Sequence, residues 1–219
     1  MDDIVIFSKR MEQNRMTGKE MNNTSEQKIV CLTENQIEEV ANLVSKNFGT
    51  LDDVDVDVIK IAKGLGFTVI QQSLKGDLLG YVVIRPNDKA MLERFGTDKV
   101  ISVKKDIDYE HKKFAIAHEL GHFLLHYDSS TNEAKEASID GDKGLTAAYV
   151  NDNEKRREAE ACKFAAFLLM GKDIFQKKYS ELHSSEIKTD ALIQLLAGYF
   201  KVPKTSVKRR IDELGLCAK

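Results

Sequence analysis

Phe114-Ala-Ile-Ala-His-Glu-Leu-Gly-His-Phe-Leu-Leu-His126 holds the most informative pattern of this chain of 219 residues. Its small and apolar residues predict a buried helix over about 109–126. His118 and His122 are four residues apart, so both imidazoles lie on one face of that helix. A buried polar triplet needs partners or a metal ion. The HExxH spacing predicts Zn²⁺ held by both histidines, with Glu119 taking a proton from the metal-bound water. The alternative is a core helix with two hydrogen-bonded histidines and no metal.

A zinc site of this kind needs a third protein ligand, because water takes the fourth position. His126 lies about 12 Å from His118 along a straight helix, which is too far for one ion. Asp128 would be the third ligand of an HExxHxxGxxD pattern, but Leu125 stands where that pattern has glycine. Asp128 therefore stays as an alternative.

The favoured third ligand lies on a second long helix, predicted to begin near residue 152. Glu160 shares an apolar stripe with Phe164 and Phe167 and is expected to point inward. Glu158 lies about 200° round the helix from Glu160, so the two are not expected to serve one site. For Glu158 the expected role is a solvated charge. The predicted zinc ligands are His118, His122 and Glu160.

Two motifs together, FAIAHELGHFLLH at 114–126 and EACKFAAFLLM at 160–170, resemble the ImmA/IrrE family of zinc metallopeptidases. The resemblance covers roughly 35–215 and implies one zinc at His118, His122 and Glu160, with Glu119 as the catalytic base. In that family the second motif usually has Asn or Asp where Cys162 stands, and Pro where Gly171 stands. Cys162 lies about 200° round the helix from Glu160, so its expected role is structural.

The order of predicted elements is two helices, a small sheet and further helices, which is an α+β arrangement. We expect a zincin-like metallopeptidase core, in which a small mixed sheet packs on the HExxH helix. The expected parts are a flexible arm at 1–28, the zinc metallopeptidase domain at 29–180 and a helical hairpin at 181–219.

A strand predicted at 99–103 precedes the zinc helix. In zinc peptidases of this broad type the neighbouring edge strand pairs with an extended substrate, so Val100, Ile101 and Ser102 are candidates for substrate pairing. Tyr127, Tyr149 and His183 are candidates for oxyanion stabilisation by residue type only.

The C-terminal hairpin resembles a helix-turn-helix, with a turn at Lys201-Val-Pro203 between two short amphipathic helices. Its second half carries a local excess of positive charge, which suits phosphate contact. The alternative is a hairpin that caps the peptidase core with a solvated basic face. The candidate DNA contacts are Lys204, Lys208, Arg209 and Arg210.

The composition limits the possible partners. There are 33 Lys and Arg against 35 Asp and Glu, a net charge of −2, which argues against a protein that coats nucleic acid. No apolar run approaches the roughly 20 residues of a membrane helix. Three cysteines far apart fit reduced thiols, and no signal peptide is visible, so we expect a cytoplasmic protein.

The family resemblance implies a protein substrate, namely a DNA-binding repressor of phage or mobile-element type with a helix-turn-helix. Cleavage would release transcription of a mobile element or of stress genes. One alternative is a DNA- or protein-binding regulator with a structural zinc. Another is one half of a repressor–protease or toxin–antitoxin-like pair that acts by sequestration.

Overall fold

The computed structural model describes residues 32–127, 135–138, 152–183 and 187–216. The predicted flexible arm at 1–28 lies outside the described residues. The described elements, in chain order, are α2 (Glu34–Phe48), α3 (Val58–Gly64), β1 (Thr68–Gln72), β2 (Gly80–Ile84), α4 (Lys89–Phe95), β3 (Lys99–Lys104), α5 (Tyr109–His126), β4 (Lys135–Ser138), α6 (Asp152–Leu169), α7 (Lys172–Leu182), α8 (Thr189–Phe200) and α9 (Lys204–Glu213).

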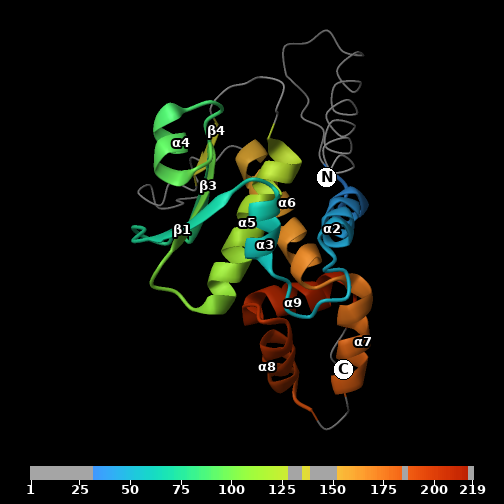
Figure 1. Cartoon of the computed structure of the whole chain (residues 1–219). Helices are drawn as coiled ribbons and strands as arrows, with labels where there is room; N and C mark the ends of the chain where they lie inside the picture. The colour runs from blue at the N-terminus through green and yellow to red at the C-terminus, as the bar shows by residue number, and fades with distance from the viewer. Residues whose placement is uncertain (1–31, 128–134, 139–151, 184–186, 217–219) are drawn as a thin grey trace.

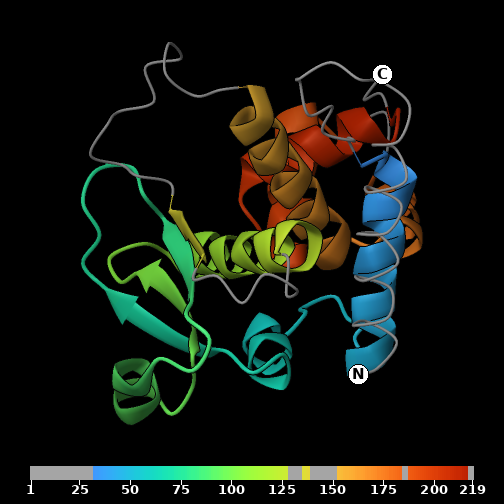
Figure 2. The same ribbon diagram turned by 90° about the horizontal axis from the view of Figure 1, so that it is seen from above.

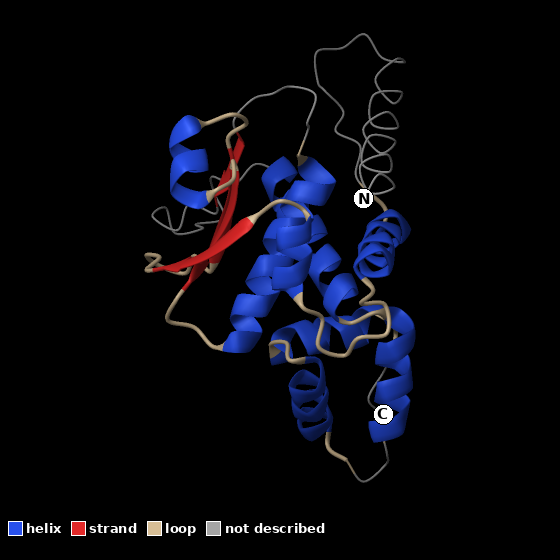
Figure 3. Cartoon of the chain, viewed as in Figure 1, coloured by secondary structure: helices blue, strands red, loops and turns tan. Residues whose placement is uncertain are grey.

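The HExxH helix α5 occupies the centre of the molecule (Figure 1). The small sheet lies on one side of it, and α6 and then α2 lie on the other (Figure 2). Helices α7, α8 and α9 gather at one end of the molecule, away from the sheet (Figure 3). The predicted α+β arrangement is confirmed, and α5 is buried between a sheet and a helical layer.

Local sequence signals account for where the main helices begin. Thr33 and Gln36 form a reciprocal capping box at the start of α2. The side chain of Asp108 accepts a hydrogen bond from the backbone amide of His111 and so caps α5. The side chain of Asp57 accepts a hydrogen bond from the backbone amide of Lys60 and so caps α3.

The sheet has the strand order β1-β3-β2-β4. Strand β3 pairs in parallel with β1 and antiparallel with β2, and β2 also pairs antiparallel with β4. The prediction that β3 is a substrate-pairing edge strand is therefore wrong, because both of its edges already hydrogen-bond to neighbours. Its candidate residues are also buried, namely Val100, Ile101 and Ser102. The strands at the two edges of the described sheet are β1 and β4.

The C-terminal helices are joined to the core by two buried cations. The side chain of Lys113 on α5 donates hydrogen bonds to Asp55 and to the carbonyl of Phe200 at the end of α8. Arg210 on α9 donates to the carbonyl of Met170, just after α6. The hairpin of α8 and α9 therefore packs against the core through specific polar contacts as well as apolar ones.

Candidate metal centre

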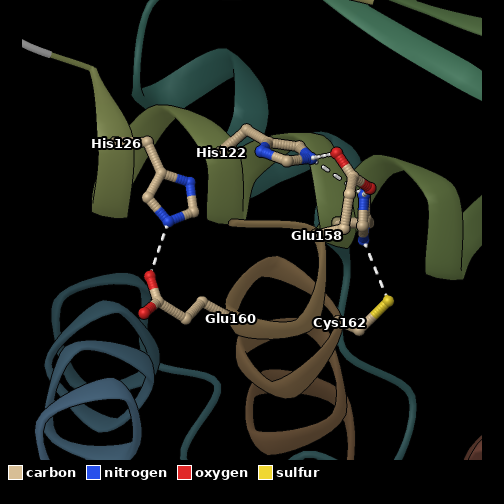
Figure 4. Close-up of polar contacts among 6 residues, drawn as sticks. His122, His126, Glu158, Glu160 and Cys162 are labelled. Carbon is tan, nitrogen blue, oxygen red and sulfur yellow. Dashed lines mark hydrogen bonds and ion pairs between the residues drawn. The ribbon is translucent and has the colours of Figure 1, made fainter. Parts of the chain in front are cut away.

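Helices α5 and α6 bring two histidines and one carboxylate together (Figure 4). The Nε2 atoms of His118 and His122 are 3.0 Å apart. The two carboxylate oxygens of Glu158 lie 3.1 Å from these nitrogens, one oxygen for each histidine. Three donor groups from two rigid helices thus converge on one point.

Close packing of α5 on α6 makes this convergence possible. A side chain at Gly121 would have its Cβ atom only 3.0 Å from the ring of Phe164 and 3.1 Å from the backbone of Ala161. Glycine on one helix and alanine on the other therefore let the two backbones approach. Glu158 lies one turn before Ala161 on α6, so its carboxylate reaches the imidazoles of the facing helix.

The donor set fits Zn²⁺. Ligand atoms about 2 Å from one tetrahedral ion lie about 3.3 Å from one another, close to the separations found here. Two imidazole nitrogens and one carboxylate leave the fourth position for water, as in catalytic zinc sites. Both histidines are buried, at 7% exposure each, and Glu158 is half-buried. The predicted histidine pair is thus placed as a metal site requires.

The charges of the cluster are strongly coupled. Burial favours the neutral form of His118, but hydrogen bonds with Cys162 and Glu158 raise its pKa to about 10. Burial also disfavours the charge of Glu158, yet the two histidines lower its pKa to about 2. The lowered pKa keeps Glu158 an anion, the form in which a carboxylate binds a divalent cation, whereas both imidazoles must lose their extra proton to bind one.

Glu119 is buried beside this cluster, with 2% of its surface exposed. Burial raises the pKa of its carboxyl group to about 8, although the charge of His118 opposes the rise. A Cβ atom at Gly80, the first residue of β2, would lie 3.5 Å from Glu119 Oε1. Glu119 therefore faces the sheet, with a pKa close to neutrality, as suits a group that accepts and releases a proton.

The structure does not bring Glu160 to the histidine pair, and this corrects the predicted ligand set. Glu160 Oε2 lies 2.9 Å from His126 Nε2, and Glu160 Oε1 accepts a hydrogen bond from the backbone amide of Leu32 (Figure 4). Glu160 points inward as predicted, but toward the last turn of α5. Glu158, predicted to be solvated, takes its place.

A sequence signal for Glu158 exists in the small residues. Glycine at 121 and alanine at 161 mark the point where two helices cross closely, and Glu158 lies one turn from that point. The stripe of Phe164 and Phe167 shows which residues are buried, but not which of them face α5.

The predicted DNA contacts on α9 differ in exposure. Lys204, Lys208 and Arg209 are exposed on α9, whereas Arg210 is 2% exposed. Arg210 as a DNA contact is therefore wrong, because its guanidinium packs between α9 and the core.

Of the residues proposed by type, Tyr127 packs on the ring of Phe123, and His183 stacks on Tyr179 at the end of α7. Tyr149 and the alternative ligand Asp128 lie outside the described residues.

Comparisons with known proteins bear on the fold and the family of the chain. The chain resembles a Mycobacterium tuberculosis transcriptional regulator, with a TM-score of 0.53 and 16% sequence identity over 94% of this chain. The chain spans about half (51%) of the length of that protein, and the likeness concerns the fold. No curated protein matches the sequence. A family model described as the IrrE N-terminal-like domain matches residues 77–212, a span that contains the histidine pair and Glu158. The chain therefore belongs to the Peptidase M78 family, a family of metallopeptidases related to IrrE.

Proposed function

We propose that this protein is a cytoplasmic zinc endopeptidase that cleaves a specific DNA-binding repressor and so releases transcription. The observation that carries the proposal is the meeting of His118, His122 and Glu158 beside the buried carboxyl of Glu119. Membership of a metallopeptidase family supports it. Among the described helices, none is long and apolar enough to cross a membrane.

The chain's own residues supply binding and proton transfer. His118, His122 and Glu158 would hold the ion, which when bound polarises a carbonyl and acidifies water. Glu119 would accept the proton of the attacking water and pass it to the leaving amine. Its buried position keeps that carboxyl away from bulk water, and its raised pKa makes its carboxylate a stronger base toward the attacking water.

The sheet offers a place for the substrate backbone. Strand β4 is an edge strand, and its neighbour β2 begins at Gly80, beside Glu119. An extended peptide that adds to β4 would continue the sheet by main-chain hydrogen bonds. We therefore transfer the expected substrate pairing from β3 to β4 (Lys135–Ser138).

Two measurements test the proposal. Elemental mass spectrometry is expected to find one zinc per chain in the wild type and in Glu160→Ala, but not in Glu158→Ala. The pair is matched, because both residues are glutamates on α6 with imidazole partners. Loss of zinc from Glu160→Ala with retention in Glu158→Ala would overturn the ligand assignment.

Activity is tested by co-expression with a helix-turn-helix repressor encoded beside the gene. The wild type is expected to cut it at one position, read by intact mass, and Glu119→Gln is expected to keep zinc but lose cleavage. Cleavage at the wild-type rate by Glu119→Gln would refute the mechanism.

A second function has one observation in its favour, the basic face of α9. Lys204, Lys208 and Arg209 are all exposed there, and a transcriptional regulator shares the fold. We propose as the alternative a DNA-binding regulator with a structural zinc. Fluorescence anisotropy with duplex DNA tests it. Binding that survives Glu119→Gln, with a salt dependence reduced in Lys208→Ala, would support it, and no binding at low salt would exclude it.

A further inference from the structure

Cys162 lies against the imidazole of His118. Its Sγ atom is 3.5 Å from His118 Nδ1, while Glu158 Oε2 is 3.1 Å from Nε2 of the same ring. Glu158 and Cys162 are four residues apart on α6 and so share one face of that helix (Figure 4). One face of α6 therefore holds the ring of His118 at both of its nitrogens.

The two ring nitrogens of His118 face different partners. Nε2 of His118 is the atom that faces His122 and Glu158. A neutral imidazole that uses Nε2 as a ligand carries its hydrogen on Nδ1, and that N–H becomes a donor. Metal-binding histidines commonly give this hydrogen to an oxygen acceptor, which fixes the tautomer and the orientation of the ring. Here the acceptor within reach of Nδ1 is the sulfur of Cys162.

We propose that Cys162 is a positioning residue for His118, and that its sulfur accepts the Nδ1–H hydrogen bond which orients Nε2 toward the metal. This inference rests on the proposed function. Cys162 is not itself a ligand in this arrangement, because its sulfur contacts the ring nitrogen that points away from Glu158.

Sulfur is a weak hydrogen-bond acceptor compared with oxygen. The Cys162 contact therefore orients the ring while adding less basicity to His118 than a carboxylate or an amide oxygen would add. It follows that this chain should bind zinc more weakly than the same three ligands would with an oxygen acceptor at Nδ1 of His118. Replacement of Cys162 by Asn or Asp should raise it.

The competing explanation is packing alone, since a cysteine is also a small apolar side chain. Four substitutions separate the two roles. Cys162→Val fills the space without an acceptor, and Cys162→Ala removes both volume and acceptor. Cys162→Ser keeps an acceptor with less volume, and Cys162→Asn supplies an oxygen acceptor. A packing role favours the variants with an apolar side chain that fills the space, whereas a positioning role favours those with a hydrogen-bond acceptor.

Zinc affinity, measured by competition with a chromophoric chelator, is the first readout. We expect Cys162→Ala and Cys162→Val to bind zinc about 10–100-fold more weakly than the wild type, the usual effect of losing such a partner. Cys162→Ser should stay within a few-fold, and Cys162→Asn should equal or exceed the wild type. Circular dichroism and thermal unfolding of the zinc-free proteins confirm that each variant is folded.

Spectroscopy supplies a readout that packing would not move. In the zinc-loaded protein, ¹⁵N NMR should show a hydrogen on His118 Nδ1 that exchanges slowly in the wild type and rapidly in Cys162→Val. The absorption bands of the Co²⁺-substituted protein should shift in Cys162→Ala and return toward the wild type in Cys162→Asn.

The outcomes are distinct. Wild-type zinc affinity in both Cys162→Val and Cys162→Ala would overturn the positioning role and leave the proposed function intact. A wild type that binds no zinc would refute the proposed function and this inference together. Affinities that follow apolar packing, with Cys162→Val closest to the wild type and Cys162→Asn weaker, would assign Cys162 to packing.

Discussion

Replacement of Arg210 tests whether the C-terminal hairpin serves the core or binds DNA. The guanidinium is 2% exposed, and its Nε donates to the carbonyl of Met170 at 3.2 Å. Two carboxylates lie near its other nitrogens, Glu38 at 3.7 Å and Glu213 at 3.6 Å. The group also lies 4.5 Å from the ring centre of Phe167. Arg210→Met keeps most of the apolar contact and removes every polar one.

The expected cost follows from these contacts. Breaking a buried ion pair by removing one partner costs about 3–5 kcal/mol. Here the side chains of Glu38 and Glu213 are 27% and 14% exposed, so water can still solvate their carboxylates in part when the arginine is removed. We therefore expect Arg210→Met to lower the free energy of unfolding by about 2–4 kcal/mol, which for a chain of this size corresponds to a Tm lower by about 5–15 °C.

The assay is thermal unfolding of the zinc-free protein in chelator, because bound zinc would add its own stabilisation. The matched control is Arg209→Met, which removes an exposed arginine from the neighbouring position of the same helix. Surface changes of this kind stay within about 0.5 kcal/mol. Equal Tm values for Arg210→Met and Arg209→Met would refute the reasoning, and so would a loss of DNA binding in Arg210→Met without any loss of stability.

Two further predictions concern the crossing of α5 on α6 and the partly buried ion pairs of Asp55. Gly121→Ala should destabilise the chain by about 1–3 kcal/mol and weaken zinc binding, because the new methyl group forces α5 away from α6. Gly198→Ala on α8 is the control, since nothing lies within 4 Å of its added Cβ atom, and equal urea midpoints would contradict the prediction. Burial opposes the charge of Asp55, but hydrogen bonds from Lys113 and Lys201 lower its pKa below 3.8. The stabilisation by Asp55 is therefore complete above the unfolded pKa and is lost as the pH falls through the folded pKa. In urea titrations, the stability difference between the wild type and Asp55→Asn should be constant near neutral pH and shrink below about pH 3.8, and a difference that grows there would be contrary evidence.

The sequence by itself determined the local part of the site. Residues four apart on a helix share a face whatever the helix packs against, so His118 and His122 were paired from their spacing alone. The apolar composition of 109–126 likewise predicted the bounds of α5. These features depend on the geometry of one element, which a short stretch of chain encodes.

The strand at 99–103 was also found, but its position in the sheet was not. Whether a strand lies inside a sheet or at its edge depends on which other segments pair with it. Val100 and its neighbours in β3 pair on both sides, and the edge next to β2 belongs to β4, which follows α5 in the chain.

Only the tertiary structure shows that Glu158, and not Glu160, lies at the histidine pair. Both face partners on α5, one at His118 and His122 and the other at His126, because a wide sector of α6 is buried between α5 and α2. Periodicity identifies which residues of a helix are buried. It does not identify which turn of the neighbouring helix they meet, because that depends on where the two helix axes cross. Here the close contact at Gly121 lies at that crossing, and Glu158, the proposed third ligand, lies one turn from it.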